Sequence, residues 1–363
     1  MSARHAPHAQ PVITEFLGAT NAARLIAQTG VIETLRLMAD AIEVDFRRWQ
    51  DFDISARVAA HSPHGVIELM PVADASDYAF KYVNGHPVNT LHGLPTVMAF
   101  GALADVATGA PRFVSELTLT TALRTAATSL MAARLLARPG SRCMALIGNG
   151  SQSEFQALAF VALLGVRELQ LFDVDTAASA KLLRNIGPYL ADYGARAHLC
   201  ASAHEAVQGA DIVTTATADK SRAAVLKADM IAPGMHINAV GGDCPGKTEL
   251  ERAVLAHANV FVEFEPQTRV EGELQQMPAD FAVTELWRVI QAKAAGRRSD
   301  DEVTVFDSVG FALEDYSALR TLHALGRSAG LLETIDLIPT LGDPKDLFGL
   351  LALNACPAHL LHA

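Results

Sequence analysis

The chain has 363 residues, of which half are hydrophobic and 19% are charged, and its formal net charge is −11. This length suffices for two domains, and the composition argues against extensive disorder. The acidic balance argues against nucleic-acid binding as the main activity, because that needs concentrated lysine and arginine, but it allows one basic pocket for a small anion.

No targeting or membrane segment is evident. Residues 1–10 contain no apolar core and therefore do not resemble a signal peptide. The best candidate for a span, 122–137, is interrupted by Arg124 and Arg134, so no membrane span is predicted. The cysteines lack metal-ligand spacing and fit reduced thiols, so we expect a cytoplasmic protein without a metal site. They are Cys143, Cys200, Cys244 and Cys356.

The first third of the chain predicts an α+β domain. Helical periodicity covers about 21–51, and a second helix is predicted over 118–137. Strand-like runs lie between these helices, and the last two are joined by a short turn that predicts a hairpin. These runs are 65–70, 78–83, 96–103 and 111–115. Arg138-Pro139-Gly140 breaks the second helix and indicates a domain boundary.

From residue 143 onward, apolar strands and helices alternate, which predicts a parallel, doubly wound sheet. The predicted strands are 143–148, 168–173, 195–200, 211–215, 235–240, 259–263 and 304–308, with helices at 154–164 and 177–190. A further helix over 312–328 is expected to return to the first domain. The predicted architecture is therefore α/β, with a Rossmann-type sheet (139–309) inserted into an α+β domain made of 1–138 and 310–363.

A glycine motif, Gly148-Asn-Gly150-Ser-Gln-Ser153, follows one predicted strand and opens a helix. The first glycine permits a tight turn and the second lets a pyrophosphate approach the backbone at the helix N-terminus. Asp173 ends the next strand, where an acid receives the ribose hydroxyls and repels a 2′-phosphate, so NAD is favoured over NADP. The alternatives are that Asp173 caps a helix, or that Asp175 makes the ribose contact.

Asp243 follows the apolar run 237–240 within Gly241-Gly-Asp-Cys-Pro-Gly246. The glycines and the proline let the main chain turn tightly and approach a ligand, and Lys247 lies four residues beyond the acid. The end of a strand in an open α/β sheet is where a reacting group is expected. The alternative is a solvated acidic turn.

Three basic residues, Arg57, Lys81 and Arg124, stand in otherwise apolar surroundings. If they are buried they should be paired, and a bound carboxylate would suit the arginine fork. Each could instead be a surface or structural residue. Glu68 is equally ambiguous, because an alternating strand can turn it toward water.

Seven segments together resemble the ornithine cyclodeaminase/μ-crystallin family, and the resemblance extends from about residue 47 to about residue 345. The segments are 55–59, 66–71, 80–87, 121–126, 147–152, the Asp243 segment and 305–310. The resemblance implies redox-neutral use of NAD, which removes a hydride from Cα of L-ornithine. The δ-amine then attacks that carbon, ammonia leaves, and the hydride returns to give L-proline. The α+β domain would bind the substrate and form a homodimer.

Roles for individual residues follow from the same resemblance. Asp243, Lys81 and Glu68 would be catalytic, with Asp243 orienting the δ-amine and moving its protons. Arg57, Lys81 and Arg124 would hold the substrate carboxylate, and Val309 would also contact the substrate. The implied cofactor contacts are Thr96, Arg124, Gly148, Gly150, Ser151, Gln152, Asp173, Thr217, Val240, Gly241, Gly242, Asp243, Lys247 and Ser308.

Other activities fit the same scaffold. A lysine cyclodeaminase would differ in pocket length, whereas an imine reductase or amino-acid dehydrogenase would change the redox state of its cofactor. A μ-crystallin-like protein that mainly binds ligand is disfavoured, because both Asp243 and Lys81 are present.

Overall fold

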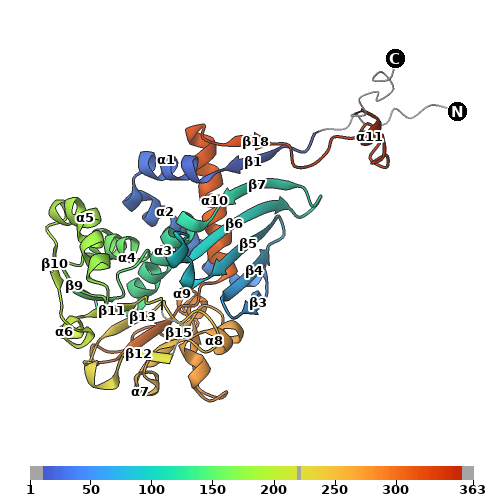
Figure 1. Cartoon of the computed structure of the whole chain (residues 1–363). Coiled ribbons are helices and arrows are strands. Elements are labelled where there is room, and N and C mark those ends of the chain that lie inside the picture. The colour runs from blue at the N-terminus through green and yellow to red at the C-terminus, as the bar shows by residue number, and fades with distance from the viewer. Residues whose placement is uncertain (1–10, 219–221, 354–363) are drawn as a thin grey trace.

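Two eight-stranded sheets organise the computed structural model, which describes residues 11–218 and 222–353 (Figure 1). Residues 1–10, which were expected not to form a signal peptide, and Cys356 lie outside the described residues. A third, two-stranded sheet pairs β12 (Arg222–Leu226) with β14 (Thr248–Leu250). Within this described part of the chain, none of the helices is long and apolar enough to cross a membrane.

The first sheet is mostly antiparallel, in the order β18-β1-β7-β6-β5-β4-β2, and β3 also pairs with β4. Only β1 and β7 run parallel among its described pairs. Its strands are β1 (Thr14–Leu17), β2 (Asp53–Ile54), β3 (Val58–Ser62), β4 (Gly65–Ala73), β5 (Asp77–Gly85), β6 (Val97–Asp105), β7 (Pro111–Glu116) and β18 (Glu333–Ile335). The predicted hairpin is confirmed as β6 and β7.

Helices cover one face of this sheet (Figure 1). α10 (Ala312–Ala329) lies against β4, β5 and β6, and it also packs on α2 (Val31–Arg47) and α3 (Thr118–Leu136). α1 (Ala19–Thr29) packs at the end of this layer. The other face keeps apolar side chains exposed, among them Leu69 and Phe100.

The second sheet is parallel throughout, in the order β10-β9-β8-β11-β13-β17-β15-β16. Its strands are β8 (Cys143–Ile147), β9 (Glu168–Phe172), β10 (Arg196–Leu199), β11 (Ile212–Thr215), β13 (His236–Ala239), β15 (Asn259–Val262), β16 (Thr284–Glu285) and β17 (Thr304–Asp307). The central strands are buried along their whole length, as the continuous apolar runs require when helices cover both faces. The doubly wound α/β class is confirmed.

Short helices connect the parallel strands. They are α4 (Ser153–Ala159, continued by a π-helical turn Phe160–Leu164), α5 (Thr176–Asp192), α6 (Ala203–Val207), α7 (Arg252–Ala256), α8 (Glu265–Glu271) and α9 (Leu286–Ile290). The chain enters this sheet from α3 and leaves it into α10. Since the strand order reverses between β8 and β11, the loops that follow these two strands diverge and leave a crevice.

Some predicted elements need correction. The helix predicted over about 21–51 is two helices, because Gly30 adopts a φ of 88° between α1 and α2, and α2 ends at Arg47. A 3-10 turn, Trp49–Asp51, follows it. The strands β1 and β18, which end the first sheet on one side, were not predicted, since each is too short to show an alternating pattern.

Candidate active site

Two adjoining cavities lie where the crevice of the parallel sheet meets the first sheet. The larger has a volume of about 270 Å3 and is lined by the loops after β8, β11 and β13 together with β4–β6 and α3. The smaller, about 150 Å3, is bounded by β4, β5, α3 and the segment after β17. Gln152, Val240 and Asp243 line both cavities, so the two form one continuous site.

The glycine motif forms the loop between β8 and α4, as predicted. Gly148 has a φ of 91°, and a Cβ there would lie 2.6 Å from the Ala216 carbonyl oxygen, so only glycine fits. The Ser153 hydroxyl donates to the Gly148 carbonyl at 2.7 Å and closes the turn. Gly150 and Ser151 line the larger cavity, and no atom crowds the position of a Cβ on Gly150. The loop therefore presents bare backbone to a ligand.

Asp173 stabilises this loop by accepting a backbone hydrogen bond from it. Its carboxylate accepts the Asn149 amide at 2.5 Å and the Asp175 amide at 2.8 Å. Asp175, in contrast, is the N-cap of α5 and accepts the Ala177 amide at 2.9 Å. The capping alternative for Asp173 is therefore wrong. Asp173 itself does not line either cavity.

Asp243 lies in the loop after β13, with half of its side chain exposed and Lys247 Nζ 3.2 Å from its carboxylate. Lys247 is buried and lines the larger cavity. Burial alone would lower the pKa of Lys247, but Asp243 and Glu249 outweigh that effect and hold it above its ordinary value. Because Asp243 faces both cavities, it is more than a solvated turn residue.

The three basic residues meet in the wall of the smaller cavity, and all three are buried and paired. Arg57 forms ion pairs with Glu68 at 2.9 Å and Glu271 at 3.0 Å. It also donates to the carbonyl oxygens of residues 309 and 310 at 2.7 and 2.5 Å. The alternative in which Glu68 faces water is wrong, since Glu68 is only 5% exposed.

Lys81 and Arg124 share a second pair of carboxylates at the start of α10. Lys81 lies 2.7 Å from Asp315, and Arg124 lies 3.1 Å from Asp315 and 2.6 Å from Glu314. Burial, with the positive charge of Arg124 next, lowers the pKa of Lys81 to about 8 although Asp315 opposes the shift. Burial raises the pKa of Glu314 to about 8 in spite of Arg124. These groups can therefore change charge near neutral pH.

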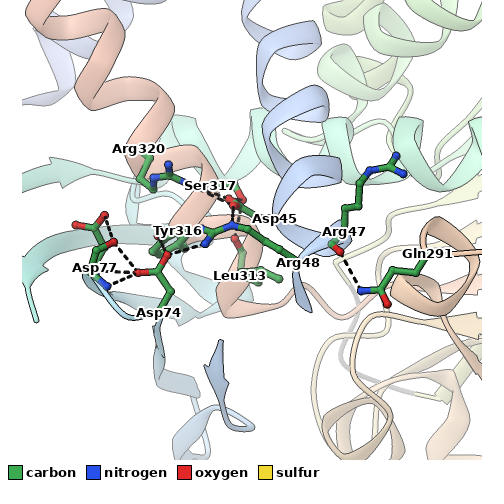
Figure 2. A network of polar contacts seen from close by, with 11 residues as sticks. Asp45, Arg47, Arg48, Asp74, Asp77, Gln291, Leu313, Tyr316, Ser317 and Arg320 are labelled. Carbon is green, nitrogen blue, oxygen red and sulfur yellow. Dashed lines mark hydrogen bonds and ion pairs between the residues drawn. The ribbon is translucent and has the colours of Figure 1, made fainter. Parts of the chain in front are cut away.

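A polar network fixes the start of α10 from its other side (Figure 2). Asp45, at the end of α2, accepts the Ser317 hydroxyl at 2.7 Å and pairs with Arg48 at 2.9 Å. Asp74 accepts the Tyr316 hydroxyl at 2.7 Å and pairs with Arg48 at 2.8 Å. The first two turns of α10 are thus held by this network, through Tyr316 and Ser317, and by the cations of the smaller cavity, through Glu314 and Asp315.

Most predicted residues line the cavities. Thr96, Gly150, Ser151, Gln152, Thr217, Val240, Gly241, Asp243 and Lys247 line the larger one. Arg57, Glu68, Lys81, Arg124, Gln152, Val240, Asp243, Ser308 and Val309 line the smaller one. Three of the predicted residues line neither cavity: Gly148, Asp173 and Gly242. Among residues 11–218 and 222–353, no three His, Cys, Asp or Glu side chains are grouped to hold a metal ion.

The sequence did not indicate the carboxylates that surround this site. Glu271 reaches Arg57 from α8, and burial raises its pKa to about 7 although Arg57 opposes this. Glu263 accepts the Ser308 hydroxyl at 2.7 Å and the Val309 amide at 3.3 Å. Glu314 and Asp315 lie four and five residues beyond the last segment that carries the family resemblance. Their charge pairing with Lys81 and Arg124 is not visible in the local sequence.

The sequence model of the ornithine cyclodeaminase/μ-crystallin family matches residues 20–328. This chain belongs to that family. The resemblance seen in the sequence is therefore confirmed. Within the family, the chain is 54% identical to an ornithine cyclodeaminase of Agrobacterium fabrum over 339 residues, covering 93% of this chain and 95% of that relative.

Solved structures of family members share the whole fold. A lysine cyclodeaminase, studied for its recognition of L-lysine, L-ornithine and L-2,4-diaminobutyric acid, superposes with a TM-score of 0.86 at 32% identity, covering 93% of this chain and 99% of its own. An archaeal alanine dehydrogenase dimer with bound NAD gives a TM-score of 0.81 at 31% identity, covering 90% of this chain and all of that one.

Proposed function

We propose that this protein is an ornithine cyclodeaminase, which converts L-ornithine to L-proline and ammonia with NAD as its cofactor. The observation that carries the proposal is the pair of joined cavities in a chain 54% identical to an ornithine cyclodeaminase. The smaller cavity is lined both by three buried cations and by Asp243. An amino acid with a carboxylate at one end and an amine at the other matches this arrangement of charge.

NAD fits the larger cavity. Gly148 makes a turn that no side chain could occupy. Gly150, Ser151 and Gln152 line the cavity, and the bare backbone of Gly150 leaves room for a pyrophosphate to approach. The carboxylate of Asp173 beside this loop disfavours the 2′-phosphate of NADP. When bound, NAD supplies the chemistry of taking a hydride from the substrate Cα and returning it. Thr217 and Val240 line the same cavity further along.

The cations of the smaller cavity would bind the substrate carboxylate. Lys81 and Arg124 keep N–H donors beyond those engaged by Glu314 and Asp315. Arg57, which is paired with Glu68 and Glu271 and also donates to two main-chain carbonyls, keeps one donor on Nη1. Since those carboxylates already balance the cations, the site can stay folded without substrate and still offer donors in a fixed orientation. Such fixed binding of one end positions the reacting carbon.

Asp243 would act on the amine end. The δ-ammonium must lose a proton before its nitrogen can attack Cα, and a half-exposed carboxylate in contact with both cavities can accept that proton and pass it to solvent. Lys247, 3.2 Å away, would keep this carboxylate oriented. Glu68, buried beside Arg57 in the wall of the smaller cavity, is the second proposed proton acceptor, and Lys81 would assist at the α-nitrogen.

We further propose that two copies pair through the uncovered face of the first sheet. Ile67, Leu69, Met98 and Phe100 are all exposed there, and the Phe100 ring stacks on Tyr82. Contiguous exposed apolar side chains of this kind are typical of interfaces. In this proposal 1–138 and 310–363 form the substrate-binding and dimerisation domain, and 139–309 binds NAD. A cytoplasmic location is also proposed, since Cys143 and Cys200 are free thiols.

The test is turnover with catalytic cofactor. L-ornithine should give equal amounts of proline and ammonia when NAD is far below the substrate concentration, with little NADH accumulating. L-lysine in parallel, assayed for pipecolate, measures the preference over the related substrate. A stoichiometric rise in NADH with a 2-oxo acid as product would identify an amino-acid dehydrogenase instead.

A further inference from the structure

Three buried carboxylates stand behind the Gly241-Gly242 pair, outside the residues assigned above. Glu249 lies on β14, Glu273 just after α8, and Asp307 at the end of β17, and all three are at most 1% exposed. Neither glycine of the pair has a positive φ among the described residues, so conformational freedom does not explain them. A Cβ on Gly241 would collide with Glu249, and one on Gly242 would lie 2.7 Å from Glu273 Oε1.

Glu249 joins two walls of the larger cavity. Its Oε1 accepts the Thr217 amide at 2.6 Å and the Thr217 hydroxyl at 2.5 Å, and its Oε2 accepts the Gly241 amide at 3.1 Å. Thr217 follows β11 and Gly241 follows β13, and both line the cavity. The ladder between these strands pairs residues only as far as Thr215 and Ala239. Beyond this register the amides of residues 240 and 241 still donate to the Thr215 carbonyl at 3.0 and 3.1 Å, and the Glu249 carboxylate extends the connection to Thr217.

Two further carboxylates hold Glu249 in the same manner. Glu273 accepts the backbone amides of Glu249 at 2.6 Å and Leu250 at 3.1 Å. Asp307 in turn accepts the amides of Glu273 at 2.9 Å and Leu274 at 2.8 Å. Each carboxylate uses both oxygens on main-chain donors, which a carboxylate can do and an amide cannot, because an amide offers a single acceptor oxygen.

We propose that Glu249 is a positioning residue for the NAD site, setting the separation of the Thr217 and Gly241 walls, and that Glu273 and Asp307 hold Glu249 in place. The proposal rests on the proposed function for the identity of the ligand. It explains why glycine is needed at both positions before Asp243. The space that two side chains would occupy is filled by the carboxylates that fix the loop.

The test compares Glu249→Gln with Glu251→Gln. The first keeps the size of the side chain but turns an NH2 group toward a backbone donor. The second, two residues further on, is exposed, accepts the Ala228 amide at 2.8 Å and is absent from both cavities. Three quantities are measured: the Kd of NAD without substrate, the KM of ornithine at saturating NAD, and amide hydrogen exchange of segments 212–218 and 236–247 without NAD.

For Glu249→Gln we expect the Kd of NAD to rise about tenfold or more, as one unsatisfied buried donor predicts, with a smaller change in the KM of ornithine. Exchange should accelerate in both segments even without NAD, and Glu251→Gln should match the unmodified protein in all three. A Kd within about twofold of the unmodified value would overturn the proposal. Failure of the unmodified protein to bind NAD would instead overturn the proposed function, while the exchange measurement would still test the link between the loops.

If Glu249→Gln does not fold, Glu273→Gln provides the second test, because Glu273 lies one link further from the cavity. It should raise the Kd of NAD by a smaller factor and accelerate exchange in the same two segments. A folded Glu273→Gln protein with an unchanged Kd of NAD and unchanged hydrogen exchange would refute the claim that Glu273 holds Glu249 in place.

Discussion

Lys81 is the cation of the smaller cavity whose charge should change within the range of an ordinary assay. Its pKa is lowered to about 8 by burial and by the nearby charge of Arg124. The guanidinium groups of Arg57 and Arg124 stay charged at every pH that the protein tolerates. Binding of a carboxylate should therefore weaken as the pH rises through about 8, because the protonated form of Lys81 is then lost.

The size of the effect follows from that pKa. Lys81 is about nine-tenths protonated at pH 7 and about one-tenth protonated at pH 9. The natural substrate is unsuitable for the measurement, since its own amines titrate in this range. Pentanoate carries the same carboxylate and carbon chain without an amine. We expect its inhibition constant against ornithine to rise about tenfold between pH 7 and pH 9.

The control is Lys81→Met, which removes the titrating cation and keeps an unbranched chain. Glu271 and Glu314, whose pKa values are raised to about 7 and about 8, gain negative charge over the same range and also weaken anion binding. The part of the pH dependence of the inhibition constant that is lost in Lys81→Met is therefore caused by the titration of Lys81. An inhibition constant that is flat from pH 7 to pH 9, or a variant with an unchanged slope, would refute the carboxylate-binding role.

Three further predictions concern other parts of the molecule. Asp243→Asn should lower kcat by about a hundredfold or more while the Kd of NAD, measured by titration, changes far less; near-normal turnover would show that this acid is structural. Asp173→Ser should relax the preference for NAD, and equal binding of NAD and NADP by the unmodified protein would contradict the assignment. Asp45→Ala removes one acceptor each from the Ser317 hydroxyl and from Arg48, so urea unfolding should show a loss of about 2 to 3 kcal/mol, and no loss would mean that the network in Figure 2 contributes little.

The parallel sheet could be predicted because each of its strands is recognisable from its own local sequence. The run 143–147 is continuously apolar, and the glycine motif follows it directly. Two of the glycines were correctly placed at the site, but the structure gives a different physical reason for their presence. Gly241 and Gly242 were expected to free the backbone for a ligand, whereas the structure shows that they leave room for Glu249 and Glu273.

The acid partners of the site could not be predicted, because their role depends on contacts between distant segments. Arg57 pairs with Glu271 from α8, more than two hundred residues away, and nothing near either residue indicates the pairing. Glu263 ends an apolar strand, where an acid ordinarily meets solvent, yet it is buried against Ser308. Charged residues inside a site built from two domains are recognisable only once both domains are in place.

The pairing of β1 with β18 has a consequence for biosynthesis. Thr14 pairs with Ile335, so the two strands are separated by about 320 residues of chain. At roughly 5 to 20 residues per second, a ribosome needs about 15 to 65 s to cover that distance. The parallel sheet is translated entirely within this interval, so its strands can assemble while one edge of β1 still has no neighbour. We expect the part of the chain that holds the parallel sheet to mature first on the nascent chain, and the first sheet to be completed only when β18 emerges.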